Sequence, residues 1–143
     1  MQILEHQFLS LTNVIKYKTT SDHKNIPEII NYLKNGVRQL GAEPNDKLVV
    51  TDKGKGEYEF LIPVNKTILS SKEYSFSPLF DLLNAIKIRH EGSFSNINKT
   101  RANLIDYIRK KKYIISSETY YRFIRVSEHN SNDCIIDIYI GIK

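Results

Sequence analysis

The sequence has one cysteine, one methionine and no tryptophan among its 143 residues. The single cysteine, Cys134, excludes an internal disulfide and is typical of a reducing compartment. No stretch approaches the roughly 20 consecutive apolar residues that a membrane span requires. The first residues also carry no basic segment followed by an apolar run, which a secretory signal would need. These absences predict a cytoplasmic protein that is not inserted in a membrane.

Motifs for metal binding and catalysis are also missing from the sequence. No pair of the four histidines has metal-ligand spacing, and Cys134 stands apart from them, so we predict no metal site and no cofactor. There is no phosphate-binding glycine loop, nucleophile elbow, zinc finger or leucine zipper. His90 and Glu91 are adjacent, as in some acid–base sites, but their position before Gly92 favours a strand end followed by a turn. We therefore predict no catalytic residues.

The chain is basic, with a formal net charge of +5 and a pI near 9.2. A basic protein can bind nucleic acid, but here the lysines and arginines are spread along the chain. The one dense run, residues 109–112, ends a predicted helix, where cations complement the helix dipole. The charge pattern therefore does not favour a nucleic-acid partner.

Two segments have the apolar spacing of an amphipathic helix. The first covers residues 25–40, with Asn25 as the expected N-cap and Gly41 as the expected C-cap. Apolar residues recur in it every three or four positions, which is the period of one helical face. The second covers residues 96–111 and shows a similar spacing. We therefore predict two helices, one in each half of the chain.

The segments around these helices are rich in β-branched and aromatic residues, which predicts strands. Residues 57–64 alternate strictly, so Glu59 lies on the strand face opposite Phe60. Residues 65–77 are polar and end at Pro78, which indicates a connector between two halves. The other predicted strands are residues 11–19, 48–51, 83–90, 119–126 and 134–142, the last two joined by a polar turn at 127–133.

The second half of the sequence repeats the first when it is shifted by 71 positions. The shift aligns a strand, a helix start and the apolar stripe of a helix, in that order. The closing strands align with a larger shift, because the second half has a longer final hairpin. Agreement in order across these elements predicts an internal duplication. The aligned pairs include Asn25 with Asn96, Leu33 with Leu104, Val37 with Ile108, and Glu59 with Asp137.

Each copy contains a strand, a helix and a hairpin, so we predict an α+β fold made of two β-α-β-β units. We expect one domain over residues 1–143, with repeats at 1–66 and 80–143 and a connector at 67–79. One unit alone has a thin core, whereas two units side by side would form an eight-stranded antiparallel sheet with two helices. A ligand pocket is expected at the seam between the units.

Short motifs in the chain resemble the GyrI-like small-molecule-binding domain, which is also the effector-binding domain of regulators such as BmrR and Rob. Residues 88–94, Ile-Arg-His-Glu-Gly-Ser-Phe, look like the family's His-x-Gly-x-aromatic segment. Residues 59–64, Glu-Phe-Leu-Ile-Pro-Val, resemble the acidic-apolar-Pro-Val ending of the family's first unit, and residues 137–142 resemble the second ending. The resemblance covers nearly the whole chain and implies the GyrI-like, regulatory-factor effector-binding fold.

The sequence also departs from that family. Gly141 stands where the second ending has proline, the chain has no tryptophan, and it shows no helix-turn-helix segment. It is therefore most similar to stand-alone bacterial members, within an uncharacterised Gram-positive group of which some are encoded near specialised secretion genes. For that group the resemblance implies a fold and no particular activity.

The resemblance implies that Glu59 is the main ligand contact, because the family places an acidic residue of this strand at the pocket floor. A poorly solvated carboxylate is costly unless a cation pairs with it, and a ligand could supply that charge. A surface position for Glu59 is the alternative. Asp137 is its counterpart in the second repeat. Aromatic rings that stack on flat ligands, or equally pack within a sheet, complete the predicted site: Phe94, Tyr121, Phe123 and Tyr139.

These features favour a stand-alone module that binds a small amphipathic or cationic molecule. One alternative is a protein-interaction module, such as an inhibitor, a chaperone or an immunity partner, because a basic chain suits an acidic protein surface. A second alternative is a hydrolase of small reactive compounds with Glu59 as base and Tyr121 beside it, although nothing in the sequence demands an enzyme. The sequence indicates neither the ligand nor the oligomeric state.

Overall fold

The computed structural model describes residues 2–126 and 133–143 and confirms the α+β class. Six strands occur in these residues, so the expected count of eight is wrong: β1 and β4 are single 18-residue strands. No helix in this part of the chain is long and apolar enough to cross a membrane. The elements are β1 (Ile3–Thr20), α1 (Ile26–Gln39), β2 (Val49–Gly54), β3 (Glu57–Pro63), β4 (Ser75–Gly92), α2 (Ile97–Lys110), β5 (Ile115–Val126) and β6 (Cys134–Ile142).

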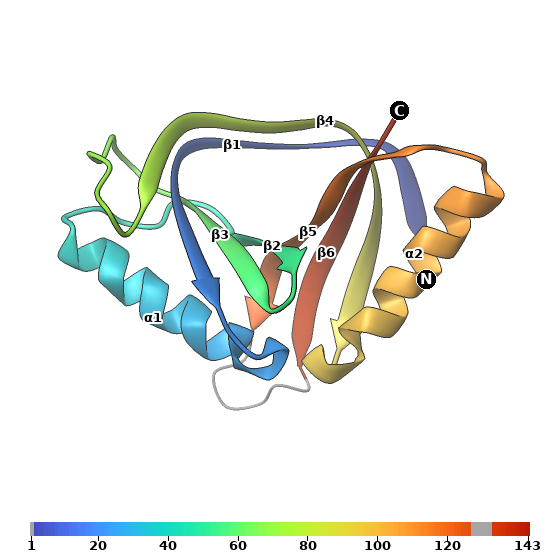
Figure 1. Cartoon of the computed structure of the whole chain (residues 1–143), viewed down its shortest axis with the longest axis horizontal. Coiled ribbons are helices and arrows are strands. Elements are labelled where there is room, and N and C mark those ends of the chain that lie inside the picture. The colour runs from blue at the N-terminus through green and yellow to red at the C-terminus, as the bar shows by residue number, and fades with distance from the viewer. Residues whose placement is uncertain (1, 127–132) are drawn as a thin grey trace. The chain divides into compact units, whose positions relative to one another are not determined.

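The chain divides into two compact units. The first unit is Ser10–Asp81, and the second unit is Leu82–Lys143 together with Met1–Leu9. Each unit contains one helix and one hairpin, α1 with β2 and β3 in the first and α2 with β5 and β6 in the second (Figure 1). The long strands β1 and β4 contribute residues to both units.

In the first unit, β1, β3 and β2 pair in antiparallel order, with β3 in the middle. The register places Ile15 opposite Ile62 and Lys18 opposite Glu59. Four residues on one stripe of α1, Ile26, Ile30, Leu33 and Val37, are buried, as the helical spacing predicted. Burying side chains of this size contributes about 1.5–3 kcal/mol each, which holds the helix on one face of the sheet.

In the second unit, β4, β6 and β5 form the corresponding antiparallel sheet, with β6 in the middle. The register places Arg89 opposite Asp137 and His90 opposite Ile136. The helix α2 packs on the face that carries His90, since the Nδ1 atom of His90 lies 2.6 Å from the Thr100 hydroxyl. The opposite face of this sheet therefore carries Arg89 and Asp137.

Both helices end in the same way. Gly41 has a positive φ of 83°, its amide donates to the carbonyl of Arg38 at 3.0 Å, and the next amide, of Ala42, donates to Val37 at 3.3 Å. This is a Schellman motif, which satisfies the last carbonyls of a helix. After α2, Lys112 takes the same role with a φ of 61°. The predicted C-cap at Gly41 is thus confirmed, while Asn25 precedes α1 without a side-chain capping bond.

The strands extend beyond the predicted limits. β1 begins at Ile3, and β4 begins at Ser75, within the polar stretch that the sequence indicated as a connector. Pro78 lies inside β4, where its missing amide removes one sheet donor. The strand at Cys134–Ile142 matches its prediction, and the polar turn expected at 127–133 lies, apart from Asp133, outside the described residues.

Candidate ligand-binding site

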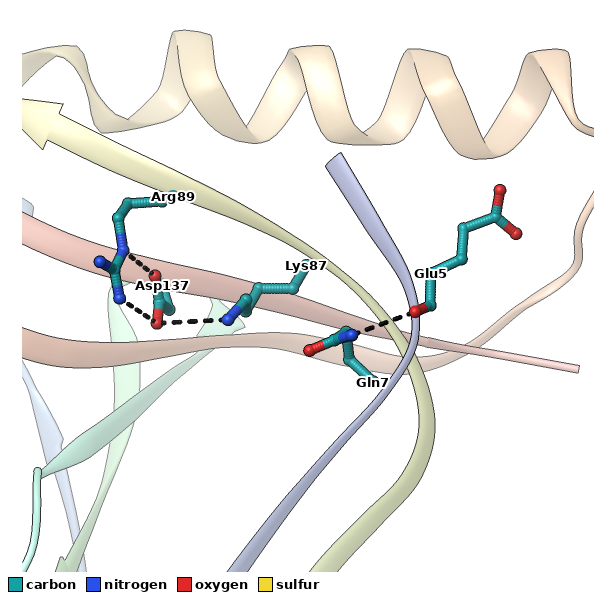
Figure 2. Close-up of polar contacts among 5 residues, drawn as sticks. All are labelled: Glu5, Gln7, Lys87, Arg89 and Asp137. Carbon is teal, nitrogen blue, oxygen red and sulfur yellow. Dashed lines mark hydrogen bonds and ion pairs between the residues drawn. The ribbon is translucent and has the colours of Figure 1, made fainter. Parts of the chain in front are cut away.

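The second unit holds a buried carboxylate on the sheet face opposite α2. Asp137, in β6, is 2% exposed. The Arg89 guanidinium donates two hydrogen bonds to it, from Nε to Oδ1 at 2.8 Å and from the terminal nitrogen to Oδ2 at 3.1 Å. The Nζ atom of Lys87 lies 3.8 Å from Oδ2 (Figure 2). Asp137 is therefore neutralised by two bases from β4, and its hydrogen bonds raise the pKa of Arg89.

The strand register explains why these residues meet. Residues 87 and 89 of β4 point to the same face because side chains alternate along a strand. In the antiparallel pair, Lys87 lies opposite Tyr139, and Arg89 lies opposite Asp137. The Lys87 Nζ atom is also 5.9 Å from the centroid of the Tyr139 ring, a cation–π contact. Tyr139 is buried, which raises the pKa of its hydroxyl.

A cavity of about 460 Å³ lies next to this cluster. Lys87 and Arg89, the two bases that neutralise Asp137, line it. Gln2 and Leu4 of β1 and Glu91 of β4 complete the lining, all within the second unit. A cavity of this size falls within the roughly 300–1,000 Å³ that small-molecule sites occupy. A ligand in it would contact the two basic side chains.

The predicted aromatic residues fall on two different faces of the second unit's sheet. Tyr139 shares the face of Asp137. Tyr121 and Phe123 lie opposite Ile138 and Ile136, on the other face, and are buried. The structure therefore does not bring Tyr121 and Phe123 together with Asp137, because side chains alternate along a strand and these two point to the opposite face of the sheet.

Phe94 belongs with the packed aromatic side chains. It lies in the short 3-10 turn before α2, and its ring centroid is 6.1 Å from that of Phe123. Both rings are buried, at 6% exposure. Their arrangement is that of aromatic packing between a helix and a sheet. Phe94 therefore lies on the helix side, with Tyr121 and Phe123.

Glu59 occupies a similar position in the first unit. Its side chain is 15% exposed, and the Nζ atoms of Lys18 and Lys53 each lie 3.9 Å from one of its oxygens. It lies opposite Lys18 of β1, as Asp137 lies opposite Arg89 of β4. Its ion pairs are longer than the bonds of Asp137, and it does not line the cavity described above. Glu59 is thus a partly buried, ion-paired carboxylate.

His90 has a packing role in the second unit. Its Nε2 atom lies 2.7 Å from the carbonyl oxygen of Ser93, which can only accept, so Nε2 carries the proton. In the neutral ring, Nδ1 then accepts from the Thr100 hydroxyl at 2.6 Å. Both ring nitrogens are satisfied by the turn and the helix that follow β4. Within residues 2–126 and 133–143, no three acidic, histidine or cysteine side chains are placed to hold a metal ion.

The basic half of the cluster was not among the predicted site residues. Arg89 falls within the 88–94 motif, and Lys87 falls only within the predicted strand 83–90. The signal that identifies them is their parity in β4: residues 87 and 89 alternate with the apolar residues Ile86 and Ile88. That pattern shows which face is polar, but the partner strand is needed to show that the face also holds Asp137.

No known protein family and no curated protein matches this chain by sequence. Solved structures match it by shape. The EcmrR C-terminal domain has a TM-score of 0.76 at 15% identity, with 100% of this chain and 99% of that chain covered. EcmrR in a DNA complex has a TM-score of 0.81 at 12% identity, and the match covers 99% of this chain but 57% of that one. The chain thus spans little more than half the length of that EcmrR chain.

Two further similar structures have different descriptions, one as a hydrolase and one as a protein bound to a small cation. A hydrolase from Listeria innocua has a TM-score of 0.60 at 8% identity, with 97% and 93% of the two chains covered. SAV2435 bound to tetraphenylphosphonium has a TM-score of 0.53 at 12% identity, with 99% and 93% covered. Likeness at such low identity establishes the architecture and no activity. The chain has a GyrI-like fold, as the sequence motifs implied.

Proposed function

We propose that this chain is a binding domain for small amphipathic cations, and that Asp137 is the residue that receives the positive charge. The observation that carries the proposal is a buried carboxylate, paired with two bases that line a cavity of about 460 Å³. Removing one base from a buried acid is costly unless another cation replaces it. A ligand cation can therefore bind Asp137 by exchanging with Lys87 or Arg89.

The two bases are suited to such an exchange. The Arg89 side chain is 47% exposed, so its guanidinium is already partly hydrated and can turn fully into water. Lys87 is held by an ion pair of 3.8 Å rather than a short hydrogen bond. The Tyr139 ring already accepts a cation–π contact from Lys87, and a ligand cation would take over that contact. Leu4 supplies an apolar contact at the cavity wall.

The fold supports the same proposal. SAV2435, which shares the architecture at 12% identity, is described as bound to tetraphenylphosphonium, a bulky aromatic cation. With the motifs at residues 59–64 and 88–94, this favours a relative of the GyrI-like small-molecule-binding domains.

The hydrolase and protein-interaction hypotheses have less support from the residues on which they depend. The hydrolase hypothesis relied on Tyr121, which is 7% exposed and lies on the sheet face that packs against α2. Its other residue, Glu59, is held between two lysines. A protein-interaction role depends on the basic surface alone. We therefore propose ligand binding ahead of both.

Titration calorimetry with tetraphenylphosphonium tests the proposal. Asp137→Asn should weaken binding at least about tenfold, or roughly 1.4 kcal/mol. Arg89→Gln should strengthen it, because the carboxylate loses an internal competitor. Glu59→Gln is the matched control and should leave the affinity unchanged. Loss of binding in Glu59→Gln with no change in Asp137→Asn would move the site to Glu59, and no binding to the native chain would refute the proposal.

A further inference from the structure

The first unit contains a second cavity, of about 230 Å³, between α1 and its sheet. Ile15 of β1 and Ile62 of β3 line it from the sheet, and Leu33 and Val37 line it from the helix. These four side chains are buried. The cavity therefore has an apolar floor built from the face of the sheet that α1 covers, opposite the face of Glu59.

Gly36 lines this space from the helix. It lies inside α1, where glycine is a poor helix former compared with alanine. A Cβ atom added at Gly36 would meet no atom within 4 Å, so neither packing nor a close approach requires glycine here. The missing side chain instead leaves the space that Gly36 helps to line. The sequence thus keeps a helix-weakening residue at the position that opens the cavity.

The second unit shows what a side chain at this position does. The shift of 71 positions that places α1 on α2 places Gly36 on Tyr107. The Tyr107 hydroxyl donates a hydrogen bond to the Glu5 carboxylate, so its ring is held in place on that helix. At this position α2 carries the fixed aromatic ring of Tyr107, whereas α1 carries glycine, which has no side chain. A ligand ring beside Gly36 would place an aromatic ring at a position where α1 has no side chain.

The rim of the cavity adds aromatic and acidic groups to the apolar floor. Tyr17, Tyr32 and Tyr74 line it, and Tyr32 is 74% exposed. The Glu73 side chain also lines it and is exposed. Tyrosine rings and a carboxylate at the mouth of an apolar space attract a cation with an apolar body. The volume lies between the roughly 150 Å³ that holds benzene and the roughly 300 Å³ of drug-sized sites.

We infer that this cavity is a binding site for a single-ring aromatic amine, whose ring lies beside Gly36 and whose ammonium group lies at Glu73. This site goes beyond the proposed function, because it lies in the first unit and shares no residue with the Asp137 cluster. A cation with four phenyl rings is too large for it. The two sites therefore select ligands of different size.

The test titrates the full chain with 2-phenylethylamine and follows amide NMR shifts. The amine should shift signals of α1 and of Ile15 and Ile62, and phenylacetate, which has the same ring and the opposite charge, should bind at least tenfold more weakly. Gly36→Leu fills the space and should abolish the shifts. Glu73→Gln should reduce the preference for the amine over the acid. Retained amine binding in Gly36→Leu, or shifts confined to other residues, would overturn the inference.

Two control variants keep the result interpretable. Gly36→Ala adds one methyl group, and it should retain amine binding while raising the melting temperature through better helix formation. Asp137→Asn should leave amine binding unchanged. If the amine bound at Asp137 instead, that variant would lose the shifts and Gly36→Leu would keep them. Failure of this inference is thus distinguishable from failure of the Asp137 site.

Discussion

The guanidinium of Arg89 contacts both carboxylate oxygens of Asp137, at 2.8 and 3.1 Å. The corresponding pair in the first unit, Lys18 and Glu59, is a single contact of 3.9 Å. A planar fork that meets both oxygens of a buried carboxylate is a stronger and more directional interaction than an exposed ammonium ion pair. The two units thus share a register but differ in how firmly their acid is held.

Arg89→Met should destabilise the protein by about 1–2 kcal/mol, because hydrogen bonds to a charged group are lost but Arg89 is half exposed. Urea unfolding measures the change. A double-mutant cycle with Asp137→Asn isolates the pair, and the second substitution should cost less in the Arg89→Met background than alone. Additive costs would show that the two side chains do not stabilise each other.

Thr100→Val should destabilise the protein by about 1–3 kcal/mol, since it leaves the buried Nδ1 atom of His90 without its hydrogen-bond partner while keeping the side-chain shape. Thr119→Val is the matched control. Its hydroxyl accepts from Nε of Arg101, which is exposed and can bond to water instead, so the cost should be smaller. Thermal unfolding measures the loss of stability in both variants. Equal losses would contradict the role assigned to Thr100.

Acid should loosen the contact between β1 and the C-terminal end of α2. Hydrogen bonds from Tyr107, and then from Tyr113 at 2.5 Å, lower the pKa of Glu5. A carboxylate whose pKa is lowered on folding stabilises the folded state above its unfolded pKa, and this is lost as pH falls through the folded pKa. The difference in urea midpoint between the native chain and Tyr107→Phe/Tyr113→Phe should therefore shrink from pH 7 to pH 3. A constant difference would exclude this linkage.

Gly141→Ala and Gly36→Ala should have opposite effects on stability. A Cβ at Gly141 would lie 2.8 Å from the Ser117 Oγ atom and 2.9 Å from a methyl carbon of Leu82, so overpacking should cost about 1–3 kcal/mol. A Cβ at Gly36 meets nothing within 4 Å, so the helix should gain roughly 0.5–1 kcal/mol. Calorimetric melting of the two variants tests the signs, and a stabilised Gly141→Ala would contradict the packing described.

Gly141 also explains a departure from the GyrI-like motif. Its amide donates a hydrogen bond to the Ser117 hydroxyl at 2.7 Å, and proline has no amide hydrogen to donate. In the first unit, Pro63 takes the corresponding position at the end of β3, opposite Val14, as Gly141 lies opposite Ala85. Glycine rather than proline at this position therefore fits the local packing of β6.

Local patterns predicted the elements well where one face of an element is buried. The spacing of Ile26, Ile30 and Leu33 identified α1 almost to its ends, because a 3.6-residue period is set by the helix itself. The start of β4 at Ser75 was missed, because Ser75, Ser77 and Pro78 have little strand preference of their own. Their extended conformation depends on pairing and packing rather than on local preference.

Strand parity decides which of the predicted site residues share a face of the sheet. Asp137 and Tyr139 were selected correctly as sharing a face, since strand alternation is a local rule. Tyr121, Phe123 and Phe94 were grouped with them although they pack on the α2 side. Which face of β5 matches which face of β6 depends on the register between the strands, and a shift of one residue reverses it.

The sequence by itself determined the two helices and the alternation within the strands, because both follow from short-range periodicity. Only the tertiary structure decided that Arg89 and Lys87 neutralise Asp137 and that Gly36 opens a cavity beneath α1. Those facts depend on residues far apart in the chain: 89 pairs with 137, and 36 and 62 line one cavity. Their energies come from many packed contacts together, and no local pattern encodes them.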